Sequence, residues 1–192
     1  MTQAIAKPQN LTFEQYLSYD DGTENRYELI DGELTALPPE SGLNIIIATH
    51  LVLVLARVVD FRLIRSHSCE LQVTGTVQNR YPDLVILNLE HLPLTQRRST
   101  LTLDMPPPQL VVEIVSPGKA NHQRDYVDKR KQYVARGIPE YWIVDPQAEV
   151  VIVLALESGA YVEIGQFRGD EAIVSPTVPD LALSAEQILQ PG

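Results

Sequence analysis

The sequence has almost no cysteine. Cys69 is the only one in 192 residues, so an internal disulfide framework is excluded. Long apolar runs are also absent: the longest, residues 43–59, is interrupted by polar side chains and is shorter than the roughly 20 residues that a membrane-spanning helix needs. The first ten residues lack the apolar segment of a secretory signal. We therefore expect a cytoplasmic protein that does not enter the membrane.

Positive charge is scarce. The chain has 15 Lys and Arg against 25 Asp and Glu, for a net charge of -10 at pH 7. Such a field repels a polyphosphate at long range, which counts against avid nucleic-acid binding. Residues 119–136 are the exception, because their six basic and two acidic side chains leave a local charge of +4. The candidates for contact with nucleic acid in this segment are Lys119, Arg124, Arg130 and Lys131.

Several familiar motifs are missing as well. The four histidines have neither HxxxH nor HxH spacing, so a zinc site is not predicted. Ser116, before Pro117 and Gly118, lacks the surroundings of a nucleophile elbow, which disfavours serine hydrolase chemistry. No helix-turn-helix, zinc finger or basic tail is present, so no sequence-specific reading of DNA is predicted.

The length and a hydrophobic content of 44% are sufficient for one folded domain, which we place at residues 11–192 after a flexible extension over residues 1–10. The residue pattern in the first half of the chain predicts five structural elements. They are a short capped helix over 12–18, a hairpin of 27–30 and 33–37 around Asp31-Gly32, a central helix over 43–59, an antiparallel hairpin of 69–77 and 81–87, and a surface loop over 90–108.

The second half predicts a strand over 110–115, a basic helix over 121–136 ended by Gly137, and a strand over 141–144. Strand, helix and strand in this order indicate a right-handed crossover between parallel strands. A further hairpin of 149–156 and 160–164 and a terminal helix that opens at Ser184 complete the pattern. The fold class is therefore α/β (α+β), with a mixed central sheet flanked by helices.

Two carboxylates lie in apolar runs that read as buried strands. Asp83 follows Pro82 at the start of one run, and Glu113 interrupts residues 110–115. An unpaired carboxylate in such a strand costs several kcal/mol, roughly, unless a cation holds it. A hard divalent cation that takes oxygen ligands, Mg²⁺ or Mn²⁺, fits both. The alternatives are a turn aspartate at Asp83, and a buried salt bridge of Glu113 with Lys129 or Arg124.

Five short motifs occur in order along the chain and carry a resemblance to a known family. They are residues 27–34 (YELIDGEL), 82–85 (PDLV), 112–117 (VEIVSP), the spaced set Asp125, Lys129, Tyr133 and Gly137, and residues 139–146 (PEYWIVDP). Together they resemble the Uma-two family of endonucleases over about residues 11–189. That family is similar to the restriction-endonuclease-like PD-(D/E)xK superfamily, whose mixed sheet carries two metal-binding acids and a lysine.

The resemblance implies that Asp83 and Glu113 are metal ligands, with the carbonyl oxygen of Ile114 as a third. The superfamily lysine belongs two residues after the second acid, where this chain has Val115. The resemblance implies that Lys129 on the following helix replaces it. The alternative for Lys129 is a helix surface pair with Asp125, four residues earlier.

Glu28 matches an acidic position early in the family pattern, which implies an extra ligand or a base that orients water. It could equally be a polar hairpin residue opposite Thr35. Asn44 stands where relatives often have a histidine.

The expected function is a Mg²⁺- or Mn²⁺-dependent endonuclease that cleaves DNA, with catalytic residues Asp83, Glu113, Lys129 and Glu28. A homodimer is plausible by analogy, since cutting both strands of a duplex often requires two active sites. The rival interpretation is a non-catalytic interaction module that retains the nuclease fold, and RNA is an alternative substrate.

Overall fold

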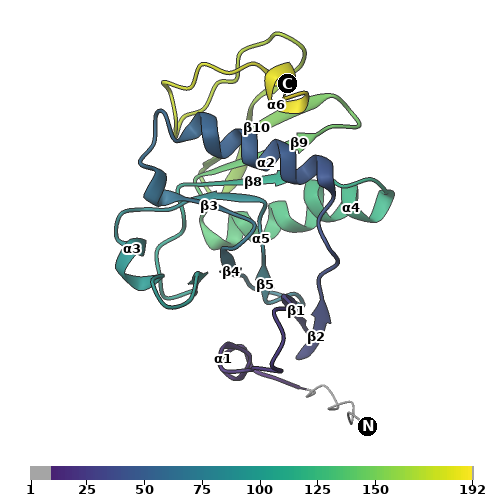
Figure 1. Cartoon of the computed structure of the whole chain (residues 1–192), viewed down its shortest axis with the longest axis vertical. Coiled ribbons are helices and arrows are strands. Elements are labelled where there is room, and N and C mark those ends of the chain that lie inside the picture. The colour runs from purple at the N-terminus through teal and green to yellow at the C-terminus, as the bar shows by residue number, and fades with distance from the viewer. Residues whose placement is uncertain (1–9, 192) are drawn as a thin grey trace.

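The computed structural model describes residues 10–191, so the predicted extension over residues 1–10 lies outside the described residues except for Asn10. A six-stranded sheet in the order β11-β10-β9-β8-β6-β3 forms its centre (Figure 1). Its strands are β3 (Ile64–Ser66), β6 (Leu84–Ile86), β8 (Leu110–Ile114), β9 (Glu140–Asp145), β10 (Val150–Glu157) and β11 (Ala160–Phe167). The β8 and β9 strands run parallel, as the crossover pattern predicts, and the other neighbours run antiparallel. The predicted mixed sheet is confirmed.

Two smaller sheets lie beside the central one. They contain β1 (Tyr27–Ile30) and β2 (Glu33–Ala36), and then β4 (Glu70–Gln72), β5 (Asn79–Arg80) and β7 (Thr100–Leu101). The hairpin of β1 and β2 is the predicted one. Its turn residues, Asp31 and Gly32, have φ angles of 48° and 80°, the positive values that an Asp-Gly turn tolerates.

The helical segments of the described residues are α1 (Phe13–Leu17), α2 (Gly42–Leu55), the 3₁₀ turn η1 (Phe61–Leu63), α3 (His91–Leu94), α4 (Lys119–Gln123), the π-helical turn η2 (Arg124–Asp128), α5 (Lys129–Arg136) and α6 (Ala185–Leu189). The α2 helix packs on one face of the central sheet and α5 on the other, whereas α1 packs against the hairpin of β1 and β2. The α4, η2 and α5 segments follow one another without a break and form the predicted basic helix, which ends at Gly137 in the left-handed conformation. No helix within residues 10–191 is long and apolar enough to cross a membrane.

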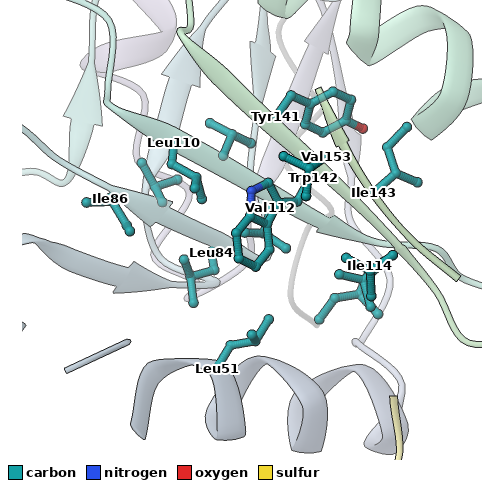
Figure 2. Packing of buried hydrophobic residues seen from close by; sticks show 14 of the residues in the cluster. Leu51, Leu84, Ile86, Leu110, Val112, Ile114, Tyr141, Trp142, Ile143 and Val153 are labelled. Atoms are coloured by element: carbon teal, nitrogen blue, oxygen red, sulfur yellow. The ribbon is translucent and has the colours of Figure 1, made fainter. Parts of the chain in front are cut away.

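Successive side chains along β8 and β9 point to opposite faces of the central sheet, so the core has one half on each face. Figure 2 shows the ring of Trp142 on the same side of the sheet as Leu51 of α2, whereas Tyr141 points to the other side. There Tyr141 meets Tyr133 of α5, with ring centroids 5.1 Å apart. Because Val112 pairs with Trp142 and successive strand residues face opposite ways, Glu113 faces the side that α5 covers.

The predicted hairpin of 69–77 and 81–87 is wrong. The β4 strand pairs with β5, and β6 leaves that sheet to lie between β3 and β8 in the central one. Pro82 stands at the break, and its missing N–H cannot continue a ladder of hydrogen bonds. The chain therefore changes sheets immediately before Asp83.

Two further predictions need correction. Residues 90–108 are not all loop, because α3 and the strand β7, parallel to β4, lie within them; elements this short leave no periodic signal. The helix predicted over 43–59 ends at Leu55 and is not central, since only one side of α2 is buried. Its other side exposes apolar side chains, among them Ile46 at 55% and Leu53 at 63%.

Candidate active site

Three neighbouring strands bring three chemically active side chains into one row. Ser66 of β3 pairs with Leu84 of β6, and Leu84 pairs with Val112 of β8. One further residue along each strand places His67, Asp83 and Glu113 side by side. Residues opposite one another in antiparallel strands share a face, with Cβ atoms about 4.5–5.5 Å apart. The predicted pair, Asp83 and Glu113, therefore meets on one face of the sheet.

Asp83 is buried and its carboxylate is held in place by the backbone. Its Oδ2 accepts a hydrogen bond of 2.6 Å from the N–H of Ile114, and its own carbonyl accepts one of 3.0 Å from the N–H of His67. Oδ1 lies 3.3 Å from Nδ1 of His67. Among the described residues, no lysine or arginine is within ion-pair distance of Asp83. The carboxylate of Asp83 can therefore accept a cation.

Glu113 is buried against α5, which supplies a partner for each carboxylate oxygen. Nζ of Lys129 donates to Oε2 at 2.6 Å, and the hydroxyl of Tyr133 donates to Oε1. Burial raises the pKa of Glu113 above its ordinary value; Lys129 lowers this pKa, and the carboxylate of Asp83 raises it again. Asp83 and Glu113 also line the same cleft.

Lys129 lies between two acids. Its Nζ is 2.6 Å from Glu113, the buried salt bridge foreseen as an alternative, and 2.8 Å from Oδ1 of Asp125. The pair with Asp125 is also buried, so the alternative of a pair on the helix surface is wrong. Burial opposes the charged form, but Glu113 and Asp125 raise the pKa of Lys129. Burial likewise opposes the charge on Asp125, yet Lys129 and Arg124 hold the pKa of that carboxyl below its usual range. Lys129 is therefore a fixed cation beside the acids.

The predicted third ligand, the carbonyl oxygen of Ile114, faces Asn44 of α2. The Asn44 side-chain nitrogen lies 3.1 Å from this oxygen, 3.1 Å from Oγ of Ser116 and 3.0 Å from Oε1 of Glu40. Since a carbonyl oxygen has two lone pairs, the contact with Asn44 leaves one acceptor position on Ile114. Asn44 joins the end of β8 to the loop before α2.

Glu28 lies opposite Thr35 in the hairpin, as one interpretation foresaw, and it also lines the cleft around Asp83. Its Oε1 accepts a hydrogen bond of 2.9 Å from the guanidinium of Arg80, and that arginine in turn contacts Gln132 of α5. Glu28 is therefore already paired with a cation.

The four basic residues proposed for nucleic-acid contact lie in different surroundings. Arg124 lines the cleft and is paired with Asp125 at 3.1 Å. Arg130 donates to the carbonyl of Tyr161 in β11 at 3.1 Å. Lys119 and Lys131 are exposed. Only Arg124 of these four lines the wall of the cleft.

The row opens into a cleft of about 300 Å³. Among the side chains that line it, four are acidic and three are permanently basic: Glu28, Glu40, Asp83 and Glu113, and Arg26, Arg124 and Lys129. Carboxylate oxygens, one free carbonyl lone pair and a buried acid without a lysine or arginine partner form a donor set that suits a hard divalent cation. The residues present therefore fit such an ion.

Three members of this site could not be identified directly from the sequence. His67 has none of the usual ligand spacings, and Glu40 lies in a loop before α2. Tyr133 appeared only as part of the family pattern. An alternating register across β3, β6 and β8 would have identified His67, but only with the correct strand pairing.

A family model described as "Putative restriction endonuclease", Uma2, matches residues 13–186. Among solved structures, a putative nuclease belonging to DUF820 from Anabaena variabilis is similar in fold, with a TM-score of 0.65 and 20% sequence identity over 93% of this chain and 97% of that one. No curated protein matches the chain significantly. Because the family model spans most of the sequence and the ordered motifs lie within it, this chain belongs to the Uma2 family of restriction-endonuclease-like proteins.

Proposed function

We propose that the protein is a Mg²⁺- or Mn²⁺-dependent endonuclease that hydrolyses phosphodiester bonds of DNA. The observation that carries this proposal is the meeting of Asp83 and Glu113 on one face of the sheet, with Lys129 2.6 Å from Glu113. A divalent cation held by Asp83, Glu113 and the carbonyl of Ile114 would polarise a phosphoryl oxygen and lower the pKa of a bound water.

The remaining groups have separate tasks. Lys129 and Tyr133 orient the carboxylate of Glu113. The ammonium of Lys129 would stabilise negative charge that develops at the phosphate. Arg124 presents its guanidinium to the cleft, where it can donate to a phosphate oxygen. Glu28 lines the same cleft and is the candidate for orienting water.

The test is cleavage of supercoiled plasmid with Mn²⁺ or Mg²⁺. We expect Asp83→Asn and Glu113→Gln to reduce nicking by at least about 100-fold, on the scale of losing a charge-stabilising catalytic group. Asp128→Asn is the matched control, because it makes the same change at an exposed carboxylate of the adjoining helix. Equal nicking by wild type and Asp83→Asn would overturn the proposal. Cleavage of single-stranded or structured RNA in place of plasmid would reassign the substrate.

One observation favours the rival function, a non-catalytic interaction module: both oxygens of Glu113 already accept hydrogen bonds from the protein. Titration of the protein with Mn²⁺ by calorimetry separates the two functions. Loss of one saturable Mn²⁺ site in Glu113→Gln supports the enzyme, whereas equal Mn²⁺ binding by the wild type and Glu113→Gln supports the module.

A further inference from the structure

A second group of ligand atoms lies on the side of Asp83 that faces away from Glu113. One ligand atom from each of Glu40, His67 and Asp83 lies within 4.8 Å of the other two, and all three residues line the cleft. Bonds of about 2.0–2.2 Å to nitrogen and oxygen place the ligands of one ion about 3–4 Å apart, so these side chains need to move by only about 1 Å to share it.

His67 is held in this position by its backbone. Its carbonyl accepts a hydrogen bond from Arg26, and its N–H donates to the carbonyl of Asp83 at 3.0 Å. It adopts a φ angle of 52°, in the left-handed region that non-glycine residues rarely occupy. The imidazole is thereby fixed beside Asp83 at the edge of the row.

The imidazole itself is poorly satisfied. Nε2 of His67 is buried and has no hydrogen-bond partner in the part of the chain that the structure describes, and Nδ1 has only the carboxylate of Asp83 at 3.3 Å. A buried polar atom without a partner costs about 1–3 kcal/mol. One ring nitrogen is therefore available to bind a metal.

The carboxylate of Glu40 is also oriented. Its Oε1 accepts hydrogen bonds from the side chain of Asn44 at 3.0 Å and from the N–H of Ser41 at 3.2 Å. Hydrogen bonds of this kind commonly orient the carboxylates that bind metals. No lysine or arginine among residues 10–191 pairs with Glu40 or Asp83, so two negative charges face the imidazole without a permanent cation.

We propose that Glu40, His67 and Asp83 form a binding site for a first-row transition-metal ion such as Mn²⁺ or Zn²⁺, beside the site on Glu113. An imidazole with two carboxylates favours these ions over Mg²⁺ and Ca²⁺, which prefer all-oxygen surroundings. Asp83 is the shared ligand of the two sites. The inference concerns binding alone and holds whether or not the protein cleaves DNA.

Pulsed electron paramagnetic resonance of the tag-free protein with Mn²⁺ tests the site, because an imidazole ligand couples its nitrogen nucleus to the manganese spin. We expect the ¹⁴N coupling in the wild type and in Glu113→Gln, and its loss in His67→Gln. His122→Gln, which changes an exposed histidine outside the cleft, should retain the coupling. Glu40→Gln should retain it as well, with an affinity at least tenfold weaker by calorimetry.

Three results would overturn the proposal: no coupling in the wild type, coupling that persists in His67→Gln, or coupling that disappears in Glu113→Gln. Thermal unfolding of each variant identifies those that fail to fold. If His67→Gln fails to fold, the weaker Mn²⁺ affinity expected for Glu40→Gln provides the second test. Failure of plasmid cleavage would overturn only the nuclease function, since the nitrogen coupling does not depend on it.

Discussion

The ammonium of Lys129 lies 2.6 Å from the carboxylate of Glu113, although the two residues are 16 positions apart on different elements. Val115, two residues after Glu113, is packed in the core and carries no charge. The cation instead comes from α5, which covers the face of β8 on which Glu113 lies. The positive charge beside Glu113 is thus supplied by the helix and not by the strand itself.

Replacing Lys129 by methionine should destabilise the fold. The substitution removes the charge and leaves Glu113 and Asp125 buried without this cation, and breaking a buried pair in this way costs about 3–5 kcal/mol. Urea unfolding measures the change. Lys131→Met, at an exposed position of the same helix, should stay within about 0.5 kcal/mol of the wild type. Equal effects of the two substitutions would contradict the buried role of Lys129.

Mn²⁺ should stabilise the wild-type protein against heat. An ion that binds only the folded state at 100 times its dissociation constant adds about 2.7 kcal/mol to the free energy of unfolding. We expect Asp83→Asn to lose most of this gain, because Asp83 serves both proposed sites. Calorimetric melting with Mn²⁺ and with excess EDTA provides the comparison, and an equal gain in Asp83→Asn would exclude Asp83 as a ligand.

Asn44→Ala should cost about 1–3 kcal/mol, the typical price of leaving a buried polar group without its partner. The substitution removes the donor that serves the carbonyl of Ile114, the hydroxyl of Ser116 and the carboxylate of Glu40. Chemical denaturation beside Asn25→Ala, an exposed asparagine, checks the value. A loss no larger than that of the control would show that water replaces Asn44.

Glu140 in β9 connects the central sheet to the C-terminal segment. It accepts hydrogen bonds from Trp142 at 2.5 Å, from Ser175 at 2.7 Å and from the N–H of Thr177 at 2.7 Å. Glu140→Gln should destabilise the protein by about 1–3 kcal/mol, because the amide turns a donor toward one of these donors. The same change at the exposed Glu157 is the control for the unfolding measurement. Matching free energies would argue that the three donors find other acceptors.

His91 should make stability depend on pH. Burial lowers the pKa of His91, whose ring faces the N–H of Asn88 and the carbonyl of Pro106, each at 3.0 Å. The folded state therefore binds fewer protons than the unfolded state, where the pKa is about 6.5, and stability is complete above that pH and declines as the pH falls toward the lower folded pKa. The wild-type melting temperature should fall more steeply than that of His91→Gln between about pH 7.5 and 5.5. Parallel curves would contradict this.

Local signals in the sequence predicted much of the fold. The capping boxes at Thr12 and Ser184, the Asp31-Gly32 turn and the parallel pairing of β8 with β9 all appear in the structure. The pairing of β6 was not predictable in this way, because adjacent segments usually form hairpins and nothing local shows that the chain changes sheets at Pro82.

The residues of the candidate site also fall into two groups, those that local sequence predicts and those that depend on strand pairing. Asp83 and Glu113 stand out because a carboxylate in an apolar run is costly, whatever its neighbours are. His67 and Glu40 do not stand out, since a polar residue in a short edge strand or a loop costs nothing by itself. Their proximity to Asp83 depends on which strands pair and in what register, and that is a property of the whole sheet.

The π-helical turn η2 determines how α4 is rotated about the helix axis relative to α5, and therefore which side chains line the cleft. In this turn the N–H of Lys129 donates to the carbonyl of Arg124, five residues earlier, so the segment contains one residue more than an α-helical turn. Deleting one residue there would rotate α4 by about 100° relative to α5. Lys129 would stay beside Glu113, while Asn121 and Arg124 would turn away from the cleft that they line. One inserted residue thus determines which side chains of α4 and η2 face the cleft.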